Sequence, residues 1–283
     1  MNAAVPSSLA RSPATARPTL RSGKRRAAST LINSPFAPLL RKRSYRTSLG
    51  DADRTAFLRL PHTLRTIEHH RFVRREGDRP THSCLLRSGF VLRHRTLGNG
   101  SRQIVAIHLP GDFVDLPGAI LGTADYSAQA ITRCEVAYLR HDALRELAFA
   151  RPPIGHALWQ DTLIDTSIAR EWIANVGRRD SRTRIAHFLC EIALRLEAAG
   201  LGKRAAWELP LTQDQIADCT GLTAVHVNRT LRTLNVAGLV TLARRSVVID
   251  DWSKLARAGD FSPGYLHLGE ISSSDNDDGS ASS

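Results

Sequence analysis

The stretch that most constrains the fold is residues 211–249, which carry the signals of two short helices joined by a tight turn. Thr212 and, three residues on, Gln215 form a capping-box pattern, which satisfies free backbone N–H groups at a helix start. Gly221 falls where the chain must turn sharply, a place that favours the left-handed backbone conformation. Thr223 can cap the second helix, which is expected to bury a stripe made of Val227, Leu231 and Leu234.

The pattern changes after the second helix. Gly238 suits the position just past a helix end. Two largely apolar runs, residues 239–242 and 247–249, then flank Arg244 and Arg245. Such runs around a short polar turn are typical of a β-hairpin. The sequence therefore predicts a helix-turn-helix followed by a hairpin wing with two cations at its tip.

The exposed positions of the second helix carry side chains suited to double-stranded DNA. They are short near the helix start and offer hydrogen-bond donors further along: Val225, His226, Asn228, Arg229 and Arg232. The N-terminal part of a recognition helix enters the major groove, where Arg can bond guanine and Asn can bond adenine. We expect this face, above all His226, Asn228 and Arg229, to read bases, while phosphates contact Thr212, Thr223, Arg244 and Arg245. The alternative interpretation is a helical hairpin that only packs.

The run Gly221-Leu222-Thr223, with Arg229 six residues after the threonine, resembles the recognition helix of the Crp/Fnr family of bacterial transcription regulators, and most closely its Fnr-like members. Many relatives have Glu in place of Val225 and Ser in place of Asn228. The resemblance implies an α+β fold: a β-roll like that of cyclic-nucleotide-binding domains, a long dimerisation helix and a winged helix-turn-helix. It also implies a cytoplasmic homodimer on a palindromic DNA site, with RNA polymerase as a further partner.

The chain has 283 residues, enough for two domains, and its formal net charge of +12 favours polyanionic partners. The excess lies in residues 1–50, which contain ten Lys/Arg and no Asp/Glu, whereas the remaining 233 residues hold 29 Lys/Arg against 27 Asp/Glu. Residues 1–50 show no apolar periodicity and are expected to be a disordered basic tail. Their composition is also that of a transit peptide, and a start codon placed too far upstream is a third interpretation; a dispensable tail is favoured.

Residues 51–150 alternate short apolar runs with turn signals. Their glycines at 77, 89, 100 and 111 have the spacing of successive short strands in a jelly-roll or β-roll domain. The strand candidates are residues 85–86, 90–92, 104–107, 113–114 and 136–139, preceded by one or two short helices within 53–71. Residues 109–113 resemble the family's Pro-Gly-acid turn. The candidate effector pocket therefore comprises Gly111, Asp112, Phe113, Tyr126 and Ser127.

Three effector chemistries occur in the family, and this sequence departs from each. For cyclic nucleotides, Tyr126 stands where relatives place the Arg that neutralises the cyclic phosphate, which removes a charge-assisted hydrogen bond. For an iron–sulfur cluster, Cys134 matches one ligand, but no Cys precedes Cys84, and one thiol cannot hold a cubane. For haem, no spacing among the eleven His residues selects a ligand, and His94 and His108 are expected to be structural. We therefore expect no cofactor and no metal, with an effector that is unidentified or absent.

Residues 151–177 are predicted to form the long dimerisation helix, with two prolines in its first turn. One apolar stripe must face the β-roll, and Asp161 and Asp165 interrupt the seam available to a partner helix. Residues 178–258 are the predicted DNA-binding domain, which begins with a strongly periodic helix over 181–196 and ends in a short helix from 251. Residues 259–283 are predicted to be a C-terminal tail, of which the Ser/Asp-rich residues 270–283 are expected to be solvated and acidic.

Several classes of protein are disfavoured. No run of 18 apolar residues occurs, so no membrane span is expected. No metal-site motif, nucleophile elbow or phosphate loop points to an enzyme. The four cysteines lie far apart and indicate reduced thiols. The alternative to a DNA-binding regulator is a small-molecule sensor with a cupin-like β domain, in which the helix-turn-helix is only structural.

Overall fold

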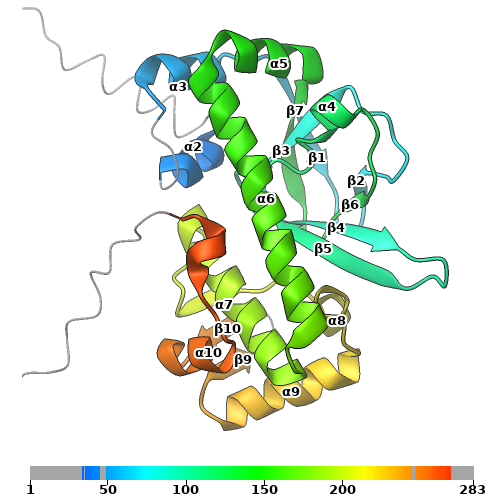
Figure 1. Cartoon of the computed structure of the whole chain (residues 1–283), viewed down its shortest axis with the longest axis vertical. Helices are drawn as coiled ribbons and strands as arrows, with labels where there is room; N and C mark the ends of the chain where they lie inside the picture. Colours follow the sequence, from blue (N-terminus) through cyan, green and yellow to red (C-terminus); the bar gives the residue numbers. More distant parts are fainter. Residues whose placement is uncertain (1–33, 35, 45–48, 244–245, 269–283) are drawn as a thin grey trace, which may run out of the picture. The chain divides into compact units, whose positions relative to one another are not determined.

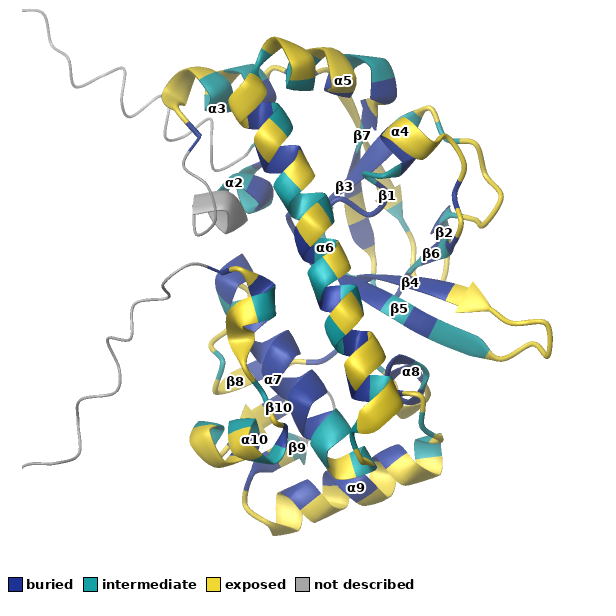
Figure 2. Ribbon diagram, viewed as in Figure 1, coloured by how far each residue is buried: buried dark blue, intermediate teal, exposed yellow. Residues whose placement is uncertain are grey.

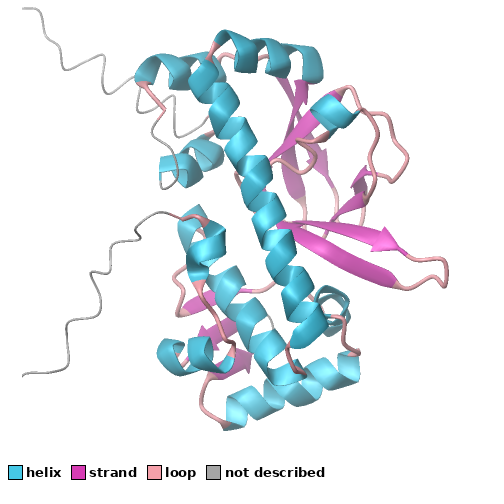
Figure 3. Cartoon of the chain, viewed as in Figure 1, coloured by secondary structure: helices cyan, strands magenta, loops and turns pink. Residues whose placement is uncertain are grey.

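The computed structural model describes residues 34, 36–44, 49–243 and 246–268 (Figure 1). Contacts divide the chain into residues 1–34 and residues 35–283, and the helices and strands of the described residues belong to the second unit. They form an α+β fold in which a β-roll is followed by a long helix and by a mainly helical domain with its own small sheet (Figure 3). This is the fold class that the sequence predicts.

Two antiparallel sheets make up the β-roll, with strand orders β1-β7-β3 and β2-β6-β4-β5. The predicted strands at 85–86, 90–92, 104–107 and 136–139 fall on β3, β4, β5 and β7, whereas residues 113–114 form only an isolated bridge, between Phe113 and Leu85. The elements of the roll are β1 His62–Ile67, β2 Phe72–Arg74, β3 His82–Ser88, β4 Val91–Thr96, β5 Arg102–His108, α4 Gly118–Leu121, β6 Ser127–Ala130 and β7 Cys134–Arg140.

Of the one or two short helices expected within residues 53–71, one is present. Helix α3, Asp51–Leu58, has the predicted type, but β1 follows it as a strand. Strand β1 pairs with β7, which sets Leu64 opposite Ala137 and Ile67 opposite Cys134. Pairing with a strand far away in the sequence therefore outweighs the local apolar pattern that allowed a second helix there.

The expectation of a disordered tail over residues 1–50 is wrong for residues 36–44. Helix α2, Ala37–Ser44, lies there, and Phe36 and Leu39 are fully buried in the core with Phe57 of α3. The rings of Phe36 and Phe57 meet edge to face at 5.2 Å between centroids. Two apolar side chains therefore anchor this basic segment, since their burial offsets the ordering of the chain around them. The rest of the predicted tail lies outside the described residues, apart from Ser34 and residues 49–50.

Helix α5, His141–Ala150, leads into the long helix α6, Pro152–Arg178, which starts with the two prolines as predicted. Figure 2 shows buried and exposed patches alternating along α6, so that one face is covered and another is open. The covered face carries Ile164, Ile168 and Trp172. The open face carries Trp159, Leu163 and Ile173, which are 66%, 53% and 73% exposed.

The two acids of α6 do not interrupt its open face. Asp165 forms an ion pair with Arg93 of β4. Asp161 and Asp165 line one pocket together with Arg93. Their carboxylates therefore belong to the side of α6 that meets the β-roll, and the expectation that they spoil the partner seam is wrong.

The carboxyl-terminal domain is built on α7, Ser181–Ala199, whose Asp180 cap and Gly200 stop agree with the predicted helix. A three-stranded sheet of order β8-β10-β9 contains the predicted hairpin and one strand that the sequence pattern did not indicate, β8. The remaining elements are β8 Ala206–Glu208, α8 Gln213–Thr220, α9 Ala224–Val236, β9 Val240–Ala243, β10 Ser246–Ile249, α10 Trp252–Ala258 and the 3₁₀ helix η1 Pro263–Leu266.

The predicted C-terminal tail, residues 259–283, contains buried residues as far as residue 268, whereas the part expected to be solvated, residues 270–283, lies outside the described residues. Leu266 is fully buried and Leu268 is 5% exposed. The Tyr265 hydroxyl donates to the Glu191 carboxylate at 2.8 Å, and the same carboxylate accepts from Trp172 Nε1 at 2.9 Å. Glu191 has no exposed surface, so the end of the described chain stabilises a charge that would otherwise be buried without enough partners.

The described residues contain no helix that is long and apolar enough to cross a membrane, and no group of three or more His, Cys, Asp or Glu side chains that could hold a metal ion. All four cysteines are buried free thiols, as the sequence predicts. Burial raises the pKa of Cys134, whose thiol contacts the Phe90 carbonyl at 3.3 Å.

Candidate nucleic-acid interface

The start of α8 has the predicted capping box. The Gln215 amide N–H donates to Thr212 Oγ1 at 3.2 Å, and the Thr212 amide donates to Gln215 Oε1 at 2.9 Å. Gly221 ends the helix with φ of 64°, and a Cβ there would lie 3.0 Å from Val176 of α6. Glycine therefore allows both the left-handed turn and the close approach of the long helix.

Helix α9 is set at a fixed angle to α8 by its buried side. Thr223 caps it by accepting from the His226 amide at 3.3 Å. Val227, Leu231 and Leu234 are buried as predicted, and they pack in one core cluster with residues of α7 and α8. The buried stripe fixes which side chains of α9 turn outward.

The predicted base-reading residues all lie on the open face of α9. Val225, His226, Asn228, Arg229 and Arg232 are exposed. Among the described residues, no carboxylate forms an ion pair with Arg229 or Arg232. Their guanidinium groups therefore keep all their donors for an external partner, with a geometry that suits guanine or phosphate.

The wing is present as a hairpin, with Ser246 opposite Ala243 and Ile249 opposite Val240. Arg244 and Arg245 lie outside the described residues, so their contact with phosphate stays a prediction. Thr212 and Thr223 both stand exposed at the N-termini of α8 and α9. Helix N-termini carry free N–H groups and partial positive charge, which suits them to phosphate.

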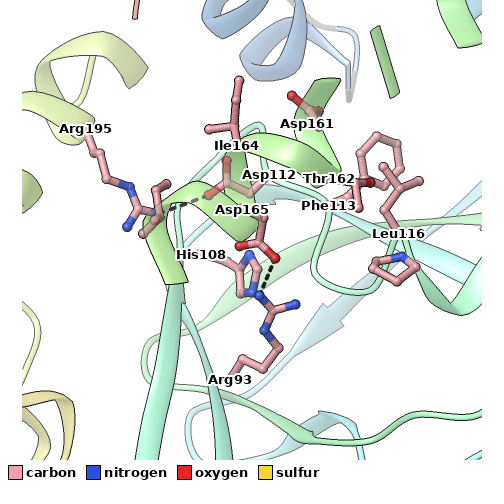
Figure 4. Close-up of a pocket in the computed structure, with 12 residues that line it drawn as sticks. Arg93, His108, Asp112, Phe113, Leu116, Asp161, Thr162, Ile164, Asp165 and Arg195 are labelled. Carbon is pink, nitrogen blue, oxygen red and sulfur yellow. Dashed lines mark hydrogen bonds and ion pairs between the residues drawn. The ribbon is translucent and has the colours of Figure 1, made fainter. Parts of the chain in front are cut away.

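The effector-pocket candidates divide into two groups. Asp112 and Phe113 line a pocket between the β-roll, α6 and α7, where the Asp112 carboxylate lies 3.6 Å from Arg195 (Figure 4). Gly111, Tyr126 and Ser127 are not among the lining residues of that pocket.

Each of the other three candidates has a structural role. Gly111, with φ of 94°, lies against α2, and a Cβ there would come within 2.8 Å of the Pro38 backbone. Tyr126 donates to the Val114 carbonyl at 3.1 Å, and burial raises its pKa to about 12. Ser127 Oγ accepts from the Glu76 amide at 3.1 Å.

An arginine does line the pocket, but it is Arg93 of β4 and not a residue at position 126. The Arg93 guanidinium lies 4.7 Å from the centre of the Tyr126 ring and bonds to the Asp165 carboxylate (Figure 4). Burial alone would raise the pKa of Asp165, and the Arg93 guanidinium instead brings it below its usual value. Helix α6 thus supplies the Asp165 carboxylate to Arg93, the strand residue that could otherwise bind the phosphate of a ligand in this pocket.

A second arginine joins this pocket to the core of the carboxyl-terminal domain. Arg195 of α7 donates to the Ile107 carbonyl of β5 at 2.5 Å and to Glu191 at 3.0 Å. Sequence reasoning missed Arg93, Asp165, Arg195 and Glu191. The signal that could have found them is a charged residue within an otherwise apolar stripe. A charge is rarely buried at such a position unless a partner neutralises it.

Comparisons with known proteins agree with this architecture. Residues 183–258 match the model of the Crp-like helix-turn-helix domain, and residues 64–151 match that of the cyclic nucleotide-binding domain. The chain is 32% identical over 215 residues to the transcriptional activator protein FnrL of Cereibacter sphaeroides, a match that covers 72% of this chain and 86% of the relative. The chain belongs to the Crp/Fnr family of transcription regulators.

Other Crp/Fnr matches point the same way. The nitrogen fixation regulation protein FixK of Azorhizobium caulinodans is 31% identical over 172 residues, which cover 60% of this chain and 68% of the relative. The solved structure of FixK2 from Bradyrhizobium japonicum has a TM-score of 0.64 at 26% identity and covers 70% of this chain and 98% of that one. FnrL and FixK are regulators and not enzymes, as the sequence predicts for this chain.

As a Crp/Fnr member, the chain has the cyclic-nucleotide-binding fold, and the pocket between its β-roll, α6 and α7 contains Arg93 and Arg195, which are paired with Asp165 and Asp112. The alternative of a sensor whose helix-turn-helix only packs loses its support, because the match to the Crp-like domain coincides with an exposed polar face on α9.

Proposed function

We propose that this chain regulates transcription by binding a palindromic DNA operator as a homodimer. The observation that carries the proposal is the open face of α9, where Asn228 and Arg229 are exposed on a capped helix pair and Arg229 has no ion-pair partner among the described residues. A two-fold dimer would present two such helices to successive major grooves, about 34 Å apart.

Bases and phosphates would be contacted by different residues. His226, Asn228 and Arg229 would read base edges, with Val225 and Arg232 beside them. Thr212, Thr223, Arg244 and Arg245 would contact phosphates and so fix the register of the domain on the duplex.

The homodimer would form along the open face of α6. Seven exposed residues follow one another there at alternating spacings of three and four: His156, Trp159, Leu163, Thr166, Arg170, Ile173 and Gly177. This is the spacing of a two-helix seam. Trp159 also borders an apolar groove with Ile120 and Phe149, which are 74% and 81% exposed. In a parallel two-fold dimer, equivalent positions of the two α6 helices lie opposite each other, so this groove would face the same groove of the partner subunit.

Further parts of the function come from the family. A regulator of chromosomal DNA would work in the cytoplasm and act on RNA polymerase bound beside the operator. Neither requires a membrane or a cofactor.

Selection of bound fragments from a random DNA pool tests the proposal. The purified protein should enrich a motif with two inverted half-sites. Arg229→Ala should lose about 1–3 kcal/mol of discrimination at one base pair in each half-site. Arg257→Ala, which removes an equal charge from the exposed surface of α10, is the control and should keep the motif. Enrichment of fragments that share no motif would refute base reading by α9. It would also be refuted if Arg229→Ala and Arg257→Ala both lost affinity equally for the selected motif and for random DNA.

A further inference from the structure

Two exposed amide side chains meet where α8 and α9 approach each other. Gln213 is the first residue of α8, and Asn228 lies on the recognition helix α9. Asn228 Nδ2 donates to Gln213 Oε1 at 3.2 Å. The contact joins two helices of the helix-turn-helix, so it depends on how α8 is placed against α9.

The backbone beneath both side chains is held firmly. The capping box of Thr212 and Gln215 fixes the first turn of α8, in which Gln213 lies. Ile216 of α8 and Val227 of α9 are buried in the same core cluster. The core therefore holds Gln213 beside Asn228, because neither helix can turn without disturbing it, and in this arrangement Gln213 Oε1 is the acceptor.

The direction of this hydrogen bond decides what Asn228 presents outward. A carboxamide has two N–H donors and one carbonyl acceptor. With one N–H bonded to Gln213, Asn228 keeps one donor and its acceptor. That pair complements adenine, which offers N7 as an acceptor and N6 as a donor in the major groove. Turned the other way, the amide would present two donors, which suit the two acceptors of guanine.

We propose that Gln213 is a specificity-determining residue, which orients the Asn228 carboxamide and so selects adenine in each half-site. The inference rests on the proposed function, because it assigns a base to the face of α9 that would enter the groove. Gln213 acts through Asn228 and needs no contact with the base itself.

Four variants in random-pool selection test the inference, with the base preference at the Asn228 position as the readout. Asn228→Ala identifies that position and should lose the adenine preference, which a bidentate pair sets at about 5-fold to 150-fold. Gln213→Ala removes the acceptor and should weaken the preference by about 2-fold to 10-fold. Gln213→Glu keeps an acceptor and should keep adenine, whereas Gln213→Lys offers only donors and should shift the preference towards guanine.

A ratio between bases cancels any uniform change of affinity, so the charge introduced by Glu or Lys does not confound the result. Asp214→Asn, at the neighbouring exposed position of α8, is the matched control and should leave adenine selected. Loss of the adenine preference in this control would overturn the specific role of Gln213.

Failure of the inference and failure of the proposed function look different. A motif that changes with Asn228→Ala but is the same for wild type, Gln213→Ala and Gln213→Lys would overturn the inference alone. Guanine at the Asn228 position in wild type would mean that the amide pair points the other way, and would also overturn it. A wild-type protein that enriches no motif would overturn the proposed function and this inference with it.

Discussion

Asp165→Ala should destabilise the protein more than the loss of one carboxylate on the surface. The Arg93 side chain is only 11% exposed, and Asp165 is its ion-pair partner. Removing one member of a buried ion pair typically costs about 3–5 kcal/mol, because the other charge stays buried without a partner. Asp165 itself is 37% exposed, so water screens part of the interaction, and we expect a loss of about 1–3 kcal/mol.

A double-mutant cycle separates the pair from its members. Arg93→Met together with Asp165→Leu removes both charges and keeps apolar volume, so the double variant should lie within about 1 kcal/mol of wild type. Each single variant and the double variant are compared by urea unfolding, with an unchanged dependence on urea as evidence that the compactness of both states is preserved. Asp142→Ala, which breaks the exposed pair with Arg140, is the control and should leave the unfolding free energy almost unchanged.

The same cycle bears on the effector. Because Asp165 already supplies an anion to Arg93, wild type should bind its operator without any added anionic ligand, and Asp165→Ala should bind it less well. A stabilising role of the ion pair is refuted if Asp165→Ala is as stable as wild type, or if the double variant is as unstable as Asp165→Ala alone. Either result would mean that the ion pair contributes no coupling between β4 and α6.

Three other properties should respond to specific changes. Ile173→Asp puts a charge on the open face of α6 and should shift sedimentation towards the monomer; a dimer that persists would contradict the proposed seam. Tyr265→Phe removes one donor from buried Glu191 and should cost about 1–3 kcal/mol in urea unfolding, and an unchanged midpoint would contradict that role. Burial lowers the pKa of His94, His141 and His187, so below about pH 6.5 the unfolded state binds more protons than the folded state. The free energy of unfolding should therefore fall as the pH drops below about 6.5, by at most about 1.4 kcal/mol per pH unit for each of these histidines. A flat profile from about pH 8 to about pH 5 would exclude this contribution.

The helix-turn-helix could be predicted from sequence because its signals are local. Thr212 and Gln215 are three residues apart, and their reciprocal bonds need only each other and the backbone between them. Gly221 marks its own turn, and the spacing of Val227 and Leu231 marks the buried side of α9. The open face follows by elimination, so the candidate base-reading residues were also within reach of the sequence.

The errors arise where distant segments meet. Strand β1 exists because it pairs with β7, and no property of residues 62–67 alone indicates that partner. Two apolar residues, Phe36 and Leu39, order a segment whose composition indicates disorder, because the core offers them a place beside Phe57. Arg93 and Asp165 are 72 positions apart in the sequence, so each charge is visible there but their ion pair is not.

The burial of Glu191 has a practical consequence for dissecting the molecule. Its carboxylate is held at once by Trp172 of α6, by Arg195 of its own helix and by Tyr265 near the end of the described chain. A DNA-binding domain cut at residue 258, where the match to the helix-turn-helix domain stops, would lack Tyr265, and one that also began at residue 183 would leave Arg195 as the only one of these three partners of buried Glu191. The shortest stable fragment should therefore begin upstream of Trp172 and include Tyr265, so the partners of one acid in the middle of α7 set its borders.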